Sequence, residues 1–417
     1  MMIFPHAPES AHLTGTNGKP LTHIWPNCSL LILFFEKTNF VFSLYLLLEE
    51  NMTPDSPLLH PIKIGPLVLK NRIAVAPMTR ISATEDGVAT EDMQRYYARF
   101  AKGGFGLIIT EGTYPDLSYS QGYLYQPGIA NEQQAEAWRP VVNAVHEAGA
   151  KIVLQLMHAG ALSQGNRWKE GSIGPSAVQP KGEQLAFYRG AGAYAMPREI
   201  TLDEISQLTQ DFATAAKRAQ HAGFDGVEIH GANGYILDQF LTDYTNQRTD
   251  RYGGSTENRV RLLVEVARAV RAMVGADYTV GMRISQGKVN DYVHKWANGQ
   301  ADAQIIFQQL AAAGVDYLHT TEHEAQAAAF GTTNSDGGTL AGYAKHFGRV
   351  PVIANGKLGS PEAANAILAD GKADIIALGK TALANRDWPQ RAANRQPLEE
   401  FDFAVLQPLA HIKPSEL

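Results

Sequence analysis

From about Ile62 onward, short apolar runs rich in β-branched residues alternate with longer amphipathic stretches. The stretch at 62–72 predicts a small hairpin around Gly65-Pro66, because two short apolar runs flank a turn-forming pair. Eight further apolar runs predict strands, since their length and composition are typical of buried strands. These runs lie at 72–78, 106–112, 151–158, 226–231, 279–285, 316–321, 351–356 and 374–380.

The intervening segments carry helical periodicity and helix boundary residues. The stretch at 201–223 begins with a Thr-x-x-Glu capping box and ends at a glycine. Ser360 followed by Pro361 predicts the start of another helix, because Pro is tolerated at the first helical position. Helices are likewise predicted over 90–104 and 256–275.

Strands that alternate with helices favour a parallel sheet covered on both faces. Eight such repeats match a closed (β/α)8 TIM barrel, while an open doubly wound sheet is the alternative. We expect a single barrel domain over 52–417, with an excursion after the third strand at 159–200. That excursion is rich in Gly, Pro and Ser and should lie on the functional face.

Residues 1–51 differ from the rest of the chain and are expected to be an N-terminal extension. The favoured interpretation is that they are upstream sequence and that Met52 is the start. A membrane segment within 29–50 is an alternative, although Glu36 and Lys37 interrupt its apolar run. The third interpretation is a disordered or loosely attached extension.

Composition excludes several function classes. The 417-residue chain has a formal net charge of -6 and no long basic run, so nucleic acid is not an expected partner. Cys28 is the only cysteine, which excludes an internal disulfide and a Cys-rich metal centre. We expect a cytoplasmic enzyme that acts on small molecules and does not associate with a membrane. The oligomeric state stays open, with a homo-oligomer as one alternative.

Polar residues and glycines gather at the carboxyl ends of the predicted strands, where barrels carry their active sites. The two glycine-containing loops after the last two strands favour a phosphate site, although ordinary helix-entry turns would look similar. The candidate residues at strand ends are Pro77, Met78, Thr79, Glu111, Gly112, Gln155, His158, His230, Asn233, Arg283, Asn355, Gly356, Gly379 and Lys380.

Three polar side chains follow the fourth barrel strand within six residues. His230 and Asn233 can both donate hydrogen bonds to one oxygen, which would polarise a carbonyl. Tyr235, with a reference pKa of about 10, is protonated at neutral pH and can act as a general acid. Each residue alone would more often be structural, but the trio at a strand end favours catalysis.

Two other patterns concern a bound ligand and a metal. Gln155 and Arg283 together suit a flat heterocycle with mixed hydrogen-bonding edges, although either alone could be structural. The string at 319–323 fits the H-x-x-E-H zinc motif, but that motif needs a helix and here it overlaps a strand end. No metal is therefore expected, and His319 or His323 is instead placed near a ligand pocket.

Taken together, these fragments resemble the Old Yellow Enzyme family of FMN-dependent ene reductases. The resemblance covers about 57–388 and rests on the order and spacing of several motifs. They are "APMTR" (76–80), "QLMHAG" (155–160), "EIHGANGYILDQFL" (228–241), "TNQRTDRYGGSTENR" (245–259), "GMRIS" (281–285) and "ANG" (354–356).

The resemblance implies roles for individual residues. Tyr235 would protonate Cα of an enone or nitroalkene, after hydride delivery from flavin N5 to Cβ. His230 and Asn233 would bind the substrate oxygen, and Tyr123 and Met157 would line the substrate pocket. FMN would be held by Pro77, Met78, Thr79, Gly112, Gln155, Arg283, Asn355, Gly356, Gly379 and Lys380. NADPH or NADH would reduce FMN on the same face and leave before the substrate binds.

Some positions depart from the family pattern. Lys380 stands where members usually have Arg, and an ammonium cannot grip phosphate in a bidentate way. Ala161 replaces a common Arg, and Met157 replaces a Trp found in some members. Two other functions are carried forward: a non-flavin barrel enzyme acting on a phosphorylated substrate, and a flavin-binding protein with little turnover.

Overall fold

The computed structural model describes residues 56–330 and 338–417. Within them, eight parallel strands close into a barrel in the order β10-β11-β12-β3-β4-β5-β8-β9. This confirms the predicted (β/α)8 fold. The barrel strands are β3 (Ile73–Val75), β4 (Leu107–Ile109), β5 (Lys151–Leu156), β8 (Gly226–Asn233), β9 (Thr279–Lys288), β10 (Tyr317–Thr321), β11 (Val352–Asn355) and β12 (Ile375–Leu378).

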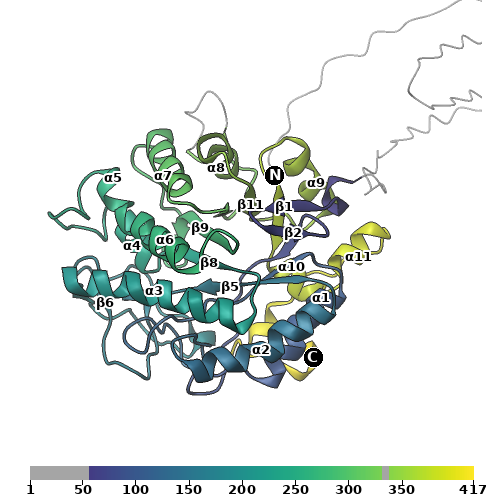
Figure 1. Cartoon of the computed structure of the whole chain (residues 1–417), viewed down its shortest axis with the longest axis horizontal. Coiled ribbons are helices and arrows are strands. Elements are labelled where there is room, and N and C mark those ends of the chain that lie inside the picture. Colours follow the sequence, from purple (N-terminus) through teal and green to yellow (C-terminus); the bar gives the residue numbers. More distant parts are fainter. Residues whose placement is uncertain (1–55, 331–337) are drawn as a thin grey trace, which may run out of the picture. The chain divides into compact units, whose positions relative to one another are not determined.

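Helices lie around the outside of the strands (Figure 1). Each is amphipathic or small-residue rich and packs its apolar face on the barrel. The helices are α1 (Glu91–Lys102), α2 (Glu132–Glu147), α3 (Leu202–Ala222), α4 (Ile236–Leu241), α5 (Thr256–Arg259), α6 (Arg261–Val274), α7 (Gln300–Ala312), α8 (Leu340–Gly348), α9 (Pro361–Ala369), α10 (Lys380–Ala384) and α11 (Trp388–Ala393).

The predicted helix boundaries agree closely with the structure. The capping box at Thr201 and Glu204 is formed in both directions, so two backbone N–H groups of α3 are satisfied. Ser360 caps α9 by accepting from the backbone N–H of Ala363. The single helix predicted over 256–275 is divided into α5 and α6 at Val260.

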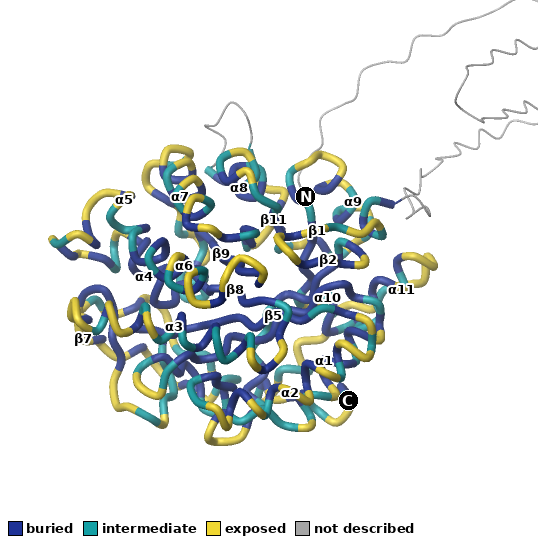
Figure 2. The backbone as a smooth tube through the Cα atoms, in the orientation of Figure 1, coloured by how far each residue is buried: buried dark blue, intermediate teal, exposed yellow. Residues whose placement is uncertain are grey.

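The hairpin β1 (Ile62–Ile64) and β2 (Leu67–Leu69) closes the amino-terminal end of the barrel. Its residues Ile64, Leu67 and Leu69 belong to one buried cluster with strand residues that point into the barrel. A second, larger buried cluster fills the space between strands and helices. Figure 2 shows the strands as dark blue and the exposed positions on the outer turns. Only the opposite end of the barrel is therefore left for a site.

Two segments cover that opposite end. The excursion between β5 and α3 contains η2 (Gly160–Leu162), the paired strands β6 (Ile173–Gly174) and β7 (Arg198–Glu199), and η3 (Ala186–Tyr188). The carboxyl-terminal segment contains η4 (Phe403–Leu406) and η5 (Pro414–Glu416). The two segments meet where the backbone N–H of Ala410 donates to the carbonyl of Phe187.

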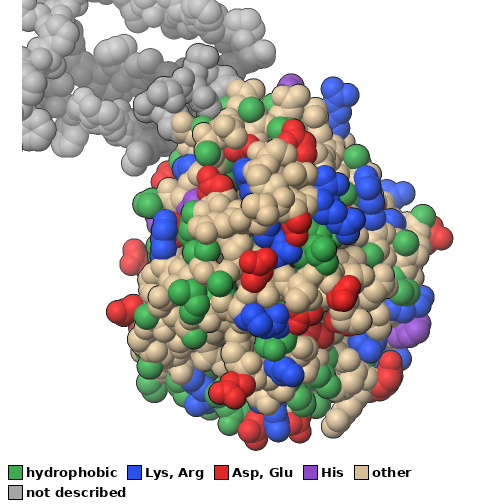
Figure 3. Space-filling view, turned by 90° about the vertical axis from the view of Figure 1, so that its left-hand side faces the viewer, with side chains coloured by type: hydrophobic (Ala, Val, Ile, Leu, Met, Phe, Trp, Pro, Cys, Tyr) green, Lys and Arg blue, Asp and Glu red, His purple; other side chains and the backbone are tan. Residues whose placement is uncertain are grey.

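On the face shown in Figure 3, Lys and Arg side chains are interspersed with Asp and Glu rather than forming one basic surface. None of the helices in 56–330 and 338–417 has the length and apolar character needed to cross a bilayer. The predicted N-terminal extension, including the alternative membrane segment within 29–50, lies outside the described residues.

Candidate active site

The barrel register brings residues from neighbouring strands to one level. His230 of β8 pairs with Arg283 of β9, and Arg283 pairs with His319 of β10. The guanidinium of Arg283 donates to Oδ1 of Asn355, at 3.0 Å, across to β11. Residues separated by more than 120 positions in the chain therefore meet at the carboxyl end of the barrel.

His230 and Asn233 lie at the end of β8, and Tyr235 follows two residues after the strand. The rings of His230 and Tyr235 lie 5.0 Å apart in an edge-to-face arrangement. The hydroxyl of Tyr235 is 2.7 Å from the hydroxyl of Tyr123, which comes from the loop after β4. Both phenols are nearly buried, at 5% and 2% exposure. Tyr123 thus contacts Tyr235, whereas its role in lining a substrate pocket stays a prediction.

Tyr235 is held as a neutral phenol. Burial raises the pKa of Tyr235, and the hydrogen bond from Tyr123 and the charge of Arg283 only partly oppose this shift. The proton is therefore retained at neutral pH, which is the state that a general acid needs.

Asn233 adopts a backbone conformation that asparagine tolerates better than most residues. Its φ is 63°, in the left-handed region, and β8 changes register with β9 between Gly231 and Asn233. Its N–H donates to Oγ of Ser285 at 2.8 Å, and its carbonyl accepts from the N–H of Val289 at 3.1 Å. These bonds to Ser285 of β9 and to Val289 just after it hold the backbone of Asn233 in this conformation.

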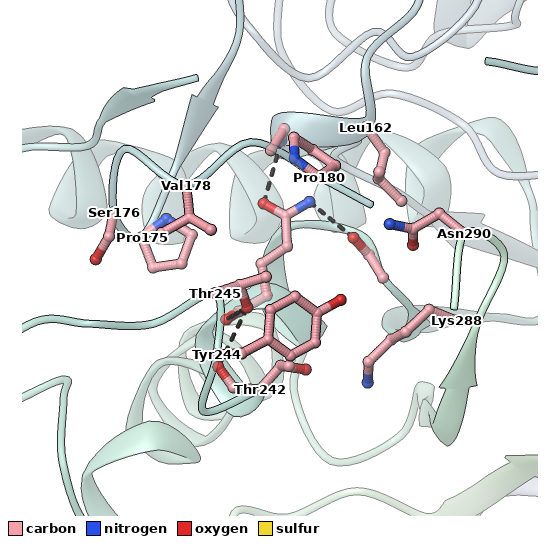
Figure 4. A pocket seen from close by; sticks show the side chains of 13 residues that line it. Leu162, Pro175, Ser176, Val178, Pro180, Thr242, Tyr244, Thr245, Lys288 and Asn290 are labelled. Atoms are coloured by element: carbon pink, nitrogen blue, oxygen red, sulfur yellow. Dashed lines mark hydrogen bonds between the residues drawn. The ribbon is translucent and has the colours of Figure 1, made fainter. Parts of the chain in front are cut away.

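The buried Lys288–Asp238 ion pair supports Gly234, the residue that follows Asn233. Asp238 accepts from the N–H of Gly234 at 2.6 Å and from Nζ of Lys288 at 2.7 Å. Figure 4 shows Lys288 and Asn290 at one side of the pocket that lies against this turn. The Lys288–Asp238 pair therefore ties this turn to β9, which contains Lys288.

Three buried nitrogens of the site have no hydrogen-bond partner among the described residues: His230 Nδ1, Arg283 Nε and His319 Nε2. An unsatisfied buried polar group costs about 1–3 kcal/mol, so such a cluster is favourable only beside a polar ligand. Burial lowers the pKa of His230 well below its usual value and that of Arg283 to about 10. At neutral pH the site thus combines a neutral imidazole with a cationic guanidinium.

These groups fit a flavin. A flat ring with acceptor atoms along one edge would satisfy Arg283, and its mixed pyrimidine edge would suit an amide. Nε2 of Gln155 donates to Oε1 of Glu228 at 2.8 Å, which leaves the amide oxygen free to accept. The donor set is therefore compatible with the predicted cofactor.

The other predicted cofactor residues lie around the same barrel end. The carbonyl of Thr79 accepts from the hydroxyl of Tyr188 at 3.2 Å. Gly112 is packed against Met157, which is 1% exposed. Pro77 and Met78 precede Thr79 at the end of β3 and are partly exposed. Their contact with a cofactor stays a prediction.

The glycine loops of the expected phosphate site differ from each other. Gly379 precedes α10 and has open space around its Cα, with only the Met78 sulfur nearby. At Gly356, φ is 136° and a Cβ would overlap the carbonyl oxygen of Glu322, so packing already requires glycine. Lys380 is exposed and lies 6.0 Å from the ring centroid of Phe401.

Asn355 is engaged within the protein. Its Oδ1 accepts from Arg283 and Thr321, and its Nδ2 donates to the carbonyl of Ala377 at 2.8 Å. Asn355 thus helps to hold the guanidinium of Arg283 in place. The predicted contact of Asn355 with the cofactor stays a prediction. His319 lies within strand β10 and binds Glu228, so the H-x-x-E-H string is not helical.

Sequence reasoning missed several residues of the site. Tyr188 comes from the excursion, and its ring lies 4.7 Å from that of Tyr123. Glu228 and the Lys288–Asp238 pair are buried charges. A charge inside an otherwise apolar strand, as in "GVEIHG", was the available indication for Glu228.

Comparisons with known proteins agree with this geometry. The family described as "NADH:flavin oxidoreductase / NADH oxidase family" matches residues 57–399. The chain is 40% identical to 12-oxophytodienoate reductase 1 of Oryza sativa subsp. japonica over 349 residues, covering 83% of this chain and 88% of the relative. Flavin oxidoreductase hxnT of Emericella nidulans is 37% identical over 374 residues, covering 84% and 94%.

Solved structures show the same relationship. The old yellow enzyme homologue from Zymomonas mobilis superposes with a TM-score of 0.75 at 35% identity, covering 86% of this chain and 98% of that one. Morphinone reductase in complex with tetrahydroNAD gives a TM-score of 0.74 at 34% identity, covering 84% and 93%. The chain therefore belongs to the Old Yellow Enzyme family and is an NAD(P)H:flavin oxidoreductase.

Proposed function

We propose that this enzyme uses FMN and NAD(P)H to reduce the activated C=C bond of α,β-unsaturated carbonyl or nitro compounds. The observation that carries the proposal is the buried phenol of Tyr235, whose ring centroid lies 5.0 Å from that of His230 and whose pKa is lowered in part by the charge of Arg283. A proton donor, an oxygen-binding donor and a fixed positive charge thus share one dry volume. Such groups act more strongly there than in water.

When bound, the cofactor would supply the redox chemistry: it would take one hydride, which carries two electrons, from NAD(P)H and give it to the substrate. The residues expected to hold FMN are those carried by the resemblance. Arg283 would bind the N1/O2 edge, where negative charge develops on reduction, and Gln155 would accept from the neighbouring N–H. Pro77, Met78, Thr79, Gly112, Gly356, Gly379 and Lys380 would surround the ring and the phosphate.

His230 and Asn233 bind and polarise the substrate oxygen in this proposal. His230 is neutral because burial lowers its pKa, so it offers one N–H donor without adding a second cation beside Arg283. Asn233 offers an amide N–H from its left-handed turn. Two donors to one developing oxyanion favour attack at Cβ, because removing one such donor often costs about 2.7–4 kcal/mol.

Tyr235 then gives its proton to Cα. The proton is available because burial keeps the phenol neutral, and the hydrogen bond with Tyr123 stabilises the phenolate that remains. Tyr188 and Tyr123 keep bulk water from the reacting atoms, since both are packed over this volume. Since one pocket serves both NAD(P)H and the substrate, turnover is ping-pong.

Two measurements test the proposal. Purified protein should show the visible absorption of bound FMN; a colourless protein that takes up no added FMN would refute it. In stopped-flow experiments, Tyr235→Phe should slow flavin reoxidation by an enone about 10²-fold or more, within the range for general acid catalysis. Flavin reduction by NADPH should stay nearly unchanged.

Tyr194→Phe is the matched control, because Tyr194 is a buried phenol of the same aromatic cluster. It should leave both half-reactions close to those of the wild type. An equal slowing of both half-reactions by Tyr235→Phe would contradict the proton-donor role.

A further inference from the structure

A carboxylate lies inside the barrel, where aliphatic side chains are usual. Glu228 of β8 is 0% exposed, and both of its oxygens accept hydrogen bonds. Oε1 accepts from Nε2 of Gln155 at 2.8 Å. Oε2 accepts from Nδ1 of His319 at 2.8 Å and from the hydroxyl of Tyr317 at 3.1 Å. Three side chains from two other strands thus converge on this one group.

Glu228 lies directly beneath the candidate site. It precedes His230 by two residues, and residues two apart on a strand face the same side. It also pairs in register with Gln155 on the neighbouring strand β5. The carboxylate is therefore adjacent to the amide expected to bind the flavin and one layer below the imidazole expected to bind the substrate.

The carboxylate is ionised. Burial alone would raise the pKa of Glu228, but His319, the charge of Arg283 and the Gln155 amide together hold it below the usual value. Burial lowers the pKa of His319, so the imidazole is neutral and the layer keeps the negative charge of Glu228. Arg283 is the cation that faces this charge.

A carboxylate can only accept hydrogen bonds, so it dictates the orientation of its neighbour. Because one of its two amide N–H groups is committed to Glu228, the Gln155 amide has a fixed orientation. Its oxygen and its second N–H remain for a ligand, whereas an unconstrained glutamine could exchange the two by turning its amide. Glu228 thus fixes which atoms of Gln155 a ligand meets.

We propose that Glu228 is a positioning residue of the flavin site that also shifts the redox balance of the bound flavin toward its oxidised form. This inference rests on the proposed function. Reduction adds negative charge at the edge near Arg283, and a buried anion facing the same guanidinium opposes that change. The low dielectric of the barrel interior makes the opposition stronger than it would be at a surface.

The test uses two variants of the full-length protein loaded with FMN. Glu228→Gln removes the charge and keeps the shape. We expect reduced FMN to gain affinity relative to oxidised FMN by about tenfold, the size of effect that a unit charge about 12 Å away has at an effective dielectric constant of about 20. For a two-electron couple this equals a positive shift of about 30 mV in midpoint potential. Spectroelectrochemistry measures the potential, and fluorescence titration measures both affinities.

Glu228→Asp keeps the charge but shortens the reach to Gln155. It should weaken FMN binding in both redox states by a similar factor and leave the potential unchanged. Asp302→Asn is the control, because Asp302 is a carboxylate of 1% exposure on the outer helix α7, bound to Thr256 and Asn298. It should change neither quantity.

The outcomes distinguish the role of Glu228 from the proposed use of FMN. An unchanged potential in Glu228→Gln would overturn the charge role, and unchanged FMN affinity in Glu228→Asp would overturn the positioning role. If the Gln variant does not fold, the Asp variant still decides the positioning role. Wild-type protein that binds no FMN would refute the proposed function itself, whatever the variants do.

Discussion

The buried Lys288–Asp238 ion pair beside the turn at Gly234 offers the sharpest test of how the candidate site is supported. Nζ of Lys288 lies 2.7 Å from Oδ1 of Asp238, and the two side chains are 2% and 0% exposed. Asp238 also accepts from the N–H of Gly234, the residue after Asn233. Lys288→Met keeps the volume and removes the charge, so it leaves a buried carboxylate without its cation.

The expected magnitude follows from burial. Breaking a buried pair by removing one partner costs about 3–5 kcal/mol. Unfolding entropy is about 2.1 cal/mol/K per residue, or roughly 0.8 kcal/mol/K for a barrel of roughly 360 residues. The melting temperature should therefore fall by about 4–6 °C, as measured by circular dichroism.

The loss should depend on pH in a defined direction. Burial already raises the pKa of Asp238, and Lys288 opposes that shift. Without Lys288 the folded-state pKa rises further above the unfolded value of about 3.9. Stability is then full below the unfolded pKa and is lost as the pH rises through the folded pKa. The variant's deficit should thus be larger at pH 8 than at pH 5.5.

Lys181→Met is the matched control, because the Lys181–Asp291 pair has the same 2.7 Å separation but Lys181 is 57% exposed. An exposed pair contributes about 0–1 kcal/mol, so this variant should melt close to the wild type. Adding Asp238→Asn to Lys288→Met should recover much of the loss, since the neutral amide still accepts from Gly234. Equal melting temperatures for the two Met variants would refute the reasoning.

Three shorter predictions concern the surroundings of the site. Burial raises the pKa of Glu111 to about 7, so stability should fall as pH rises through about 7; Glu111→Gln should flatten thermal unfolding profiles over this range. Gly356→Ala places a Cβ against the carbonyl of Glu322 at positive φ and should cost about 1–3 kcal/mol in denaturant unfolding. Glu416→Gln unpairs the buried Arg80, which is 0% exposed, and should accelerate proteolysis of the carboxyl-terminal segment relative to Glu399→Gln on an exposed pair.

The sequence by itself determined the barrel. Each strand reads as a short apolar run because a parallel strand is buried on both faces, and each helix carries its own boundary residues. The capping box at Thr201 and the cap at Ser360 are local interactions, so a short stretch of chain contains all the information they need. The position of His230 and Asn233 at a strand end also followed from the order of residues alone.

Tertiary structure decided what those residues meet. The left-handed turn at Asn233 depends on bonds from β9, and the pairing of Tyr235 with Tyr123 joins positions 112 residues apart. Glu228 reads in the sequence as one charge within a strand, and its partners Gln155 and His319 come from other strands. Burial and register are properties of the closed barrel, so the protonation states and unpaired donors of the candidate site exist only once the barrel has formed.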